Sequence, residues 1–206
     1  MDSDLQLLER WRAGDARAGN DLFKRHFDSV WRFFDNKIDG DVDELVQGTF
    51  LACVKSRDRF RAQSSFRTYV FAIARNELYR FLRRRRRDAD ALDFGITSLA
   101  NLGTTPSSFA ARNQEHQLLL SALYELPVDQ QVLLELHYWE DMAPKELAEV
   151  FDIPSSTARS RLMRARQGLR AVMEKLAKES PADLHRSDDS LDRWARSLRG
   201  KWSGPR

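Results

Sequence analysis

The residues with the clearest chemistry lie between positions 144 and 170, where arginines and short polar residues recur at helical spacing. A guanidinium fork can donate two hydrogen bonds to one guanine, and serine hydroxyls bind phosphates or base edges. The outward set is Ser155, Ser156, Arg159, Ser160, Met163, Arg164 and Arg166, with Arg161 at the flank and Lys145 on the segment before. This pattern predicts an interface with nucleic acid.

A helix-turn-helix is the element expected to position these side chains. The inward positions are Leu147, Ala148 and Phe151 on a short first helix, and Ala158, Leu162, Ala165 and Leu169 on the second. Asp152 stands where the turn needs a left-handed residue, Ile153 fills the angle between the helices, and Pro154 can open the second helix. We therefore expect the second helix to enter the major groove. The alternative is an ordinary amphipathic hairpin with a basic outer face.

A second basic cluster ends an earlier helical segment, where residues 80–87 read RFLRRRRR. The chain's net charge is only +3, so this local density matters more for binding a polyanion than the total charge does. The alternative is a solvated charge run at a helix end.

Apolar residues recur with the period of a helix over most of the chain, and strand-like runs are hard to find. Glycine and proline number only 9 and 6, so the composition predicts an all-α protein. We expect two small helical domains, at residues 5–87 and 114–176, that behave independently. Residues 88–113, with Gly95, Gly103 and Pro106, have the composition of a flexible linker. Residues 177–206 form a C-terminal extension.

Enzymatic chemistry is not indicated by any motif. The histidines at positions 26, 116, 137 and 185 are scattered, and no Gly-rich phosphate loop or nucleophile motif occurs. A single cysteine, Cys53, cannot form an internal disulfide or a metal cluster. The sequence therefore predicts no catalytic residue, no metal and no cofactor. The acidic N-terminus lacks the apolar core of a signal peptide, and no run suits membrane insertion, so we expect a cytoplasmic protein.

Taken together, the two helical blocks resemble bacterial sigma factors of the extracytoplasmic-function (ECF) type. The similarity covers about residues 5–87 and 115–172. It rests on NDLFKRHFDSVWRFF, DELVQGTFLACV and DRFRAQSSFRTYVFAIARNELYRFLRRRR in the first block, and on LYELPVDQQVLLELHYWEDMAPKELAEVFDIPSSTARSRLMRARQGL in the second. The resemblance implies a sigma region 2 domain, a sigma region 4 domain, and an alternative sigma factor that directs promoter recognition, DNA opening and transcription initiation.

The resemblance also implies partners and residue roles. Glu44 and Gln47 match the family's surface for the clamp coiled coil of the largest catalytic subunit of core RNA polymerase, although they also suit a plain polar outer face. Gly48 departs from the acidic residue usual beside them. Region 4 would contact the polymerase flap. An anti-sigma factor is also expected as a partner, because members of this family commonly have one.

Two promoter elements are assigned by the same resemblance. Arg159, Ser160, Met163 and Arg164 match positions that read the −35 element. The residues that match the capture of the opened −10 element are Gln63, Ser64, Ser65, Tyr69 and Asn76, with Arg80, Arg83 and Arg84 on phosphates. Tyr69 is equally compatible with a half-buried core aromatic, and Ala72 replaces a larger residue common in the family.

A stand-alone helix-turn-helix regulator is the alternative function. Such proteins usually dimerise so that two recognition helices span adjacent turns of DNA, and the sequence contains no obvious dimerisation element.

The C-terminal extension carries its own pattern beyond the resemblance. Its apolar positions recur at helical spacing: Leu191, Trp194, Ala195, Leu198 and Trp202. We predict a short amphipathic helix over residues 188–202, docked on this chain's own domains or on a regulator, because two exposed tryptophans require a covering surface. The alternative is a disordered basic tail.

Overall fold

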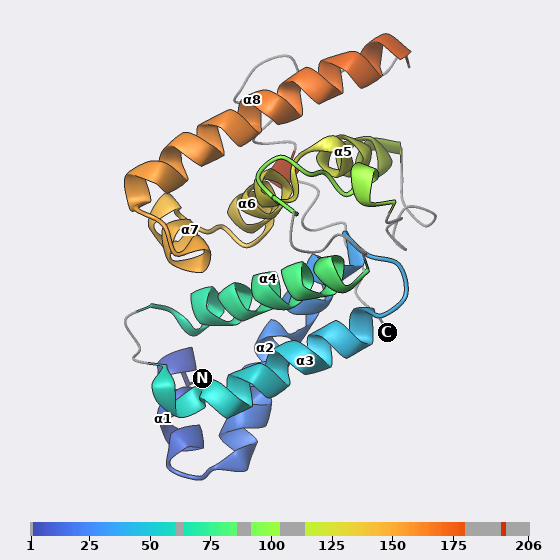
Figure 1. The fold of residues 1–206 in the computed structure, drawn as a ribbon. Helices are drawn as coiled ribbons and strands as arrows, with labels where there is room; N and C mark the ends of the chain where they lie inside the picture. The colour runs from blue at the N-terminus through green and yellow to red at the C-terminus, as the bar shows by residue number, and fades with distance from the viewer. Residues whose placement is uncertain (1, 61–63, 86–91, 104–113, 180–194, 197–206) are drawn as a thin grey trace.

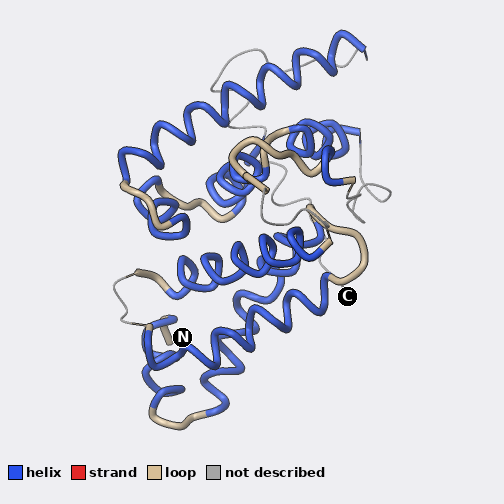
Figure 2. The backbone as a smooth tube through the Cα atoms, viewed as in Figure 1, coloured by secondary structure: helices blue, strands red, loops and turns tan. Residues whose placement is uncertain are grey.

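A computed structural model describes residues 2–60, 64–85, 92–103, 114–179 and 195–196 (Figure 1). Over these residues the regular elements are helices, joined by loops and by one isolated bridge between Ser98 and Pro127 (Figure 2). The predicted all-α class is confirmed.

The N-terminal domain consists of α1 (Asp4–Arg12), α2 (Ala16–Asp35), α3 (Val42–Ser56) and α4 (Phe66–Arg84), with a 3-10 turn at Arg57–Arg59 after α3. Short polar side chains define where α1, α2 and α4 start. Ser3 caps α1 in a reciprocal pair with Gln6, and the Asp15 carboxylate accepts hydrogen bonds from the first backbone N–H groups of α2. Each cap satisfies donors that the helix itself leaves unpaired.

The core of this domain is built by apolar side chains from all four helices. Leu22, Phe34, Phe71 and Leu78 are fully buried. The helices α1 and α2 approach so closely at Gly19 that a Cβ there would lie 2.7 Å from the Trp11 ring. The glycine is therefore required by packing.

The C-terminal domain consists of α5 (Gln114–Glu125), α6 (Val128–Trp139), α7 (Pro144–Phe151) and the long α8 (Ser155–Glu179). Pro127 separates α5 from α6. In Figure 1, α8 runs along the outer side of this domain, over α5, α6 and α7.

The segment between the domains is partly built into the fold, although its composition suggested a flexible linker. The Phe94 ring is buried and stacks on Tyr79 of α4, with 4.3 Å between centroids. Backbone hydrogen bonds from Val128 and Asp129 to the carbonyls of Thr97 and Phe94 tie it to the start of α6. A short 3-10 turn, Ala100–Leu102, follows. The partners of Phe94 are distant in sequence, so the linker's composition could not reveal them.

The two domains pack against one another, whereas the sequence suggested independent domains. Along this seam, α2 and α4 of the N-terminal domain face α6 and α7 of the C-terminal domain (Figure 1). At its centre Lys37 Nζ lies 2.5 Å from Glu135 Oε2, with both side chains almost fully buried. Burial lowers the pKa of the Lys37 ammonium, and the Glu135 carboxylate opposes that shift.

Arginines of α4 add a second layer of contacts across the seam. Arg67 donates to the backbone carbonyl of Glu140 at 2.5 Å and pairs with the Glu146 carboxylate at 2.9 Å. Arg75 donates to the Val150 carbonyl at 2.6 Å, and its guanidinium lies over the Phe151 ring of α7. These bonds explain why α7 lies along α4.

The predicted helix over residues 188–202 lies outside the described residues, except for Ala195 and Arg196, which are helical. The Trp139 indole Nε1 donates to the Ala195 carbonyl at 3.0 Å. None of the described helices has the length and apolar character needed to cross a lipid bilayer.

Candidate nucleic-acid interface

The turn between α7 and α8 has the geometry that the sequence predicted. Asp152 adopts φ 53° and ψ 51°, which is the left-handed region. The following N–H, of Ile153, donates to the Ala148 carbonyl at 3.0 Å, and the Ala158 N–H donates to the Pro154 carbonyl at 3.0 Å. Three residues therefore connect the end of α7 to the start of α8 at Ser155.

The inner face of α8 is also as predicted, because Ala158, Leu162, Ala165 and Leu169 are all buried. The outer face is exposed at Ser156, Arg159, Ser160, Met163 and Arg164, and Ser155 is half-buried. Met163 is 56% exposed. This face presents hydrogen-bond donors and one apolar group to solvent.

Two further arginines of α8 turn toward the protein. Arg161 lies 3.6 Å from Asp129 of α6. Arg166 was predicted to face outward, and this is wrong: its Nη2 lies 2.9 Å from His137 Nε2, and its guanidinium lies over Tyr138. Both partners are on α6, which the periodicity of one helix cannot reveal. Lys145, on α7, is exposed as expected.

A second candidate surface lies on α4. At about 100° per residue, Tyr69, Asn76 and Arg80 lie on the side of the helix opposite Arg67 and Arg75, the two arginines that contact the C-terminal domain. Asn76 is exposed. The packing of the two domains therefore leaves this side of α4 uncovered.

Tyr69 is shared between that surface and the core. Its ring lies 4.4 Å from Phe60, centroid to centroid, and its hydroxyl lies 2.5 Å from Ser56 Oγ. Burial raises the pKa of the Tyr69 phenol. The side chain is half-buried, as one of the two interpretations of the sequence had it.

The serines before α4 differ in what they are free to bind. The Ser65 hydroxyl caps the helix by accepting from the Thr68 N–H at 3.1 Å, so this side chain already has a structural role. Ser64 is half-buried. Gln63 lies outside the described residues.

Exposed arginines gather at the C-terminal end of α4. Arg80 pairs with Glu77 at 2.6 Å, and Arg83 lies over the Phe94 ring at 5.2 Å from its centroid. Arg84 is exposed. The Arg80 side chain remains 64% exposed beside the buried Glu77, so its other guanidinium N–H groups can still reach a phosphate.

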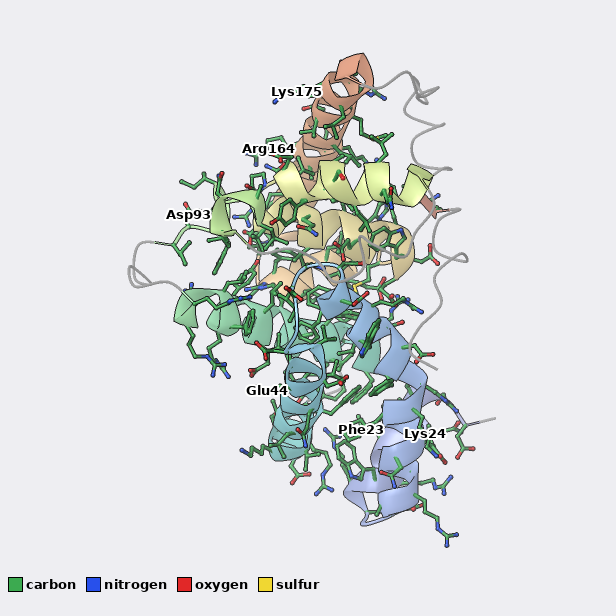
Figure 3. All side chains as sticks on the ribbon, turned by 90° about the vertical axis from the view of Figure 1, so that its right-hand side faces the viewer. Phe23, Lys24, Glu44, Asp93, Arg164 and Lys175 are labelled. Atoms are coloured by element: carbon green, nitrogen blue, oxygen red, sulfur yellow. The ribbon has the colours of Figure 1, made fainter. Side chains whose placement is uncertain are left out.

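A third surface lies on α3, where Glu44 and Gln47 are exposed (Glu44 is labelled in Figure 3). An apolar groove runs beside them between α2 and α3. Its lining consists of Phe23, Phe27, Asp43, Val46, Gln47, Phe50, Leu51 and Val54. Leu51 and Val54 are about half exposed. Our sequence reasoning missed both, although they are apolar positions outside the buried stripe of this helix.

Comparison with known proteins agrees with this arrangement of surfaces. The family model "Sigma-70 region 2" matches residues 22–88, and "Sigma-70, region 4" matches residues 116–169. The ECF RNA polymerase sigma-E factors of Haemophilus influenzae and Escherichia coli K12 are each 28% identical over 176 residues. That match covers about four fifths of this chain and 92% of each relative.

The chain belongs to the ECF group of the sigma-70 family.

Solved structures share the fold of this sigma factor. CnrH in complex with the cytosolic domain of CnrY superposes with a TM-score of 0.62 at 27% identity, covering 84% of this chain and 99% of CnrH. RpoE of Bartonella quintana, in complex with the anti-sigma factor NepR, gives a TM-score of 0.57 at 22% identity. That match covers 75% of this chain and 96% of RpoE.

As a sigma factor, the protein directs RNA polymerase to promoters and initiates transcription without catalysing a reaction itself. Across the described residues, no group of three or more His, Cys, Asp or Glu side chains is arranged to hold a metal. Burial raises the pKa of the Cys53 thiol to about 12, so this cysteine is a protonated core residue of the sigma factor.

Proposed function

We propose that the exposed face of α8 reads the −35 promoter element through Arg159, Ser160, Met163 and Arg164. Arginine suits the O6 and N7 acceptors of guanine, and the Met163 side chain offers an apolar contact to a thymine methyl group. Ser155, Ser156 and Lys145 bind the flanking phosphates. Arg161, which already pairs with Asp129, contributes a phosphate contact from the flank. The exposure of this face, including Met163, is the observation that carries the proposal.

The uncovered side of α4 captures the opened −10 strand in this proposal. Tyr69 offers the edge of a ring supported by Phe60, and Asn76 offers an amide to a flipped base. The pocket is completed by Gln63, Ser64 and Ser65. Arg80, Arg83 and Arg84 hold the phosphates of the single strand, whose binding combines base stacking with a positively charged groove.

Core RNA polymerase engages α3 in the proposal. Glu44 and Gln47 provide polar contacts to the clamp coiled coil, and the apolar groove with Leu51 and Val54 provides buried area beside them. Polar rims around an apolar centre are typical of protein interfaces. The region 4 domain contacts the polymerase flap.

We assign residues 5–87 to the region 2 domain, 88–113 to the linker, 114–176 to region 4, and 177–206 to the C-terminal extension. The protein acts in the cytoplasm, where its polymerase is. An anti-sigma factor inhibits it in this proposal. The support is that CnrH, which has a similar structure, was solved in complex with the cytosolic domain of CnrY.

Transcription in vitro over a promoter library, with core polymerase and with or without the chain, tests the proposal. We expect a set of promoters to be transcribed only when core polymerase and this chain are both present. A footprint by the chain alone, at the same sites and salt concentration, would instead favour a self-sufficient DNA-binding regulator.

The polymerase surface is tested separately by the double substitution Glu44→Ala and Gln47→Ala. We expect weaker binding to core polymerase and unchanged binding of the isolated −35 duplex. Asp28→Ala and Lys55→Ala, at exposed positions elsewhere on α2 and α3, form the control. Equal affinity of both doubles for core polymerase would remove Glu44 and Gln47 from the interface.

A further inference from the structure

Two arginines connect the end of α1 to the 3-10 turn after α3, and each binds the backbone of the other's segment. The Arg12 Nη2 donates to the Arg57 carbonyl at 2.9 Å and also to the Phe60 carbonyl. In return, the Arg57 Nη1 donates to the Trp11 carbonyl at 3.2 Å. The last carbonyls of a helix have no regular partner within it, and a cation suits that negative end. We call this pair of arginines the arginine brace.

The arginine brace also holds two aromatic rings in the same crossed manner. The Arg57 guanidinium lies 5.3 Å from the centroid of the Trp11 ring, and the Arg12 guanidinium lies 6.0 Å from that of Phe60. A cation within about 6 Å of a ring face is attracted by the ring. Phe60 is buried and Arg12 is half-buried, so water weakens these contacts less than it would at the surface. Arg12 therefore restrains Phe60 at both its carbonyl and its ring.

Phe60 transmits this restraint to Tyr69 of α4. The two ring centroids lie 4.4 Å apart, with 34° between the ring planes. The Tyr69 hydroxyl hydrogen-bonds to Ser56 Oγ, and Ser56 directly precedes Arg57. Both of these contacts of Tyr69 therefore come from the segment that the arginine brace ties to α1.

A restrained ring has an advantage when it stacks on an unpaired base. A side chain that is already ordered loses little conformational freedom on binding, and such preorganisation strengthens binding. The proposed stacking surface of Tyr69 thus depends on residues that lie behind it and do not touch the DNA.

We propose that Arg12 and Arg57 are positioning residues for capture of the opened −10 strand. They hold Phe60, and through Phe60 they hold the Tyr69 ring at the strand-binding side of α4. This inference rests on the function proposed above for Tyr69, and it extends that function by giving α1 a part in promoter opening.

The test uses polymerase holoenzyme formed with the full chain carrying Arg12→Met or Arg12→Lys. Methionine removes the donors but keeps an unbranched stem and a helix propensity close to that of arginine. Lysine keeps a cation with three N–H donors. Arg17→Met, at an exposed position on α2, is the matched control. Permanganate reactivity of promoter thymines measures opening, and binding of a −35 duplex is measured in parallel.

We expect Arg12→Met to reduce the equilibrium constant for opening by roughly three- to tenfold. That is part of the roughly five- to 150-fold that loss of one stacked base costs. Arg12→Lys should retain most of the opening, because its ammonium can reach the same carbonyls, and Arg17→Met should retain all of it. Binding of the −35 duplex should be unchanged in every chain.

A combination of Arg12→Met with Tyr69→Ala separates positioning from general stabilisation. If Arg12 acts through Tyr69, the double variant should open promoters no worse than Tyr69→Ala alone, because the ring that Arg12 positions is absent. A general stabilising role would add its own loss, so additive effects would overturn the inference. If Arg12→Met does not fold, the same comparison with Arg57→Met decides the question.

The two proposals fail in different ways. Normal opening by Arg12→Met together with impaired opening by Tyr69→Ala would overturn the positioning role and leave the stacking role of Tyr69 intact. Normal opening by a folded Tyr69→Ala chain would contradict the stacking role itself.

Discussion

Individual side chains of α8 divide into those that face solvent and those that hold the domain together. Arg159 and Arg164 are exposed, whereas Arg161 and Arg166 reach Asp129 and His137 of α6. The four arginines carry the same charge, so charge alone does not distinguish them. Only the exposed pair is free to form the two-pronged hydrogen bonds that identify a guanine.

We expect Arg159→Ala to cost about 1–3 kcal/mol of binding free energy on a cognate −35 duplex and to relax the preference at one base pair. Lys145→Ala, the matched change at a phosphate contact, should weaken all sequences about equally and reduce the salt dependence. Binding measured over all single-base variants of the duplex checks both. A uniform loss for Arg159→Ala would show that it does not read a base.

Tyr69 combines a ring at the proposed strand-binding surface with a hydroxyl bonded to Ser56. We expect Tyr69→Phe to open promoters normally, since the ring remains. Tyr69→Ala should reduce opening, because stacking on an unpaired base is worth roughly 1–3 kcal/mol. Permanganate reactivity of promoter thymines reports opening, and thermal denaturation controls for lost packing against Phe60. Normal opening by a folded Tyr69→Ala chain would leave Tyr69 with a core role only.

At the scale of the helices, two glycines differ in whether the packing leaves room for a side chain. Gly19 lies where α2 touches α1, and Gly48 lies in the middle of α3. An added Cβ would lie 2.7 Å from Trp11 at position 19 but 3.9 Å from Glu77 Oε2 at position 48. The first distance is a clash and the second is an ordinary contact.

Gly48→Ala should therefore raise the free energy of unfolding by about 0.5–1 kcal/mol, the gain expected for alanine within a helix. Gly19→Ala should lower it by about 1–3 kcal/mol through overpacking against Trp11. Urea denaturation of the two variants checks both signs. Destabilisation by Gly48→Ala would mean that α3 and α4 approach more closely than the structure has them.

At the scale of the whole molecule, the buried pair of Lys37 and Glu135 joins the two domains. Removing one partner leaves the other charge buried, which costs about 3–5 kcal/mol, whereas an apolar pair of similar volume is tolerated. We expect Lys37→Met to separate the domains, because opening returns Glu135 to water. Lys37→Met combined with Glu135→Leu should close them again. Energy transfer between dyes on Lys24→Cys and Lys175→Cys, two exposed positions on different domains, measures the domain separation in both variants. A double variant with the same large separation as Lys37→Met would contradict this account.

The pH dependence of the seam follows from Tyr79, whose hydroxyl donates to the Asp129 carboxylate. Burial, and then the negative charge of Asp129, raises the pKa of the Tyr79 phenol well above its ordinary value near 10. A raised pKa means that the folded protein keeps a proton that the unfolded chain loses. The stability that Tyr79 contributes is therefore complete below about pH 10 and declines as the pH rises beyond it.

The matched variant is Tyr79→Phe, which keeps the ring but cannot titrate. We expect the difference in unfolding free energy between the two chains to be constant up to about pH 9 and to shrink above about pH 10. Other groups that titrate there are common to both chains and cancel. A difference that stays constant to about pH 11 would show that Tyr79 is not buried as described.

The sequence by itself determined the features that depend on neighbours within one or two turns of a helix. The period of the apolar residues predicted the helices of both domains. The order Phe151-Asp152-Ile153-Pro154 predicted the turn, since only a few residue types tolerate a left-handed backbone. The exposed face of α8 followed from the same period, and the resemblance to ECF sigma factors rested on these local segments.

The tertiary structure alone decided the features that join distant parts of the chain. Lys37 meets Glu135 and Trp139 meets Ala195 across more than fifty residues. Phe94 is buried in a segment whose composition suggested a flexible linker. Arg166 turns inward because α6 offers His137. Periodicity reports which side of a helix is apolar, but it carries no information on which other helix covers that side. The closed arrangement of the two domains therefore became visible only in three dimensions.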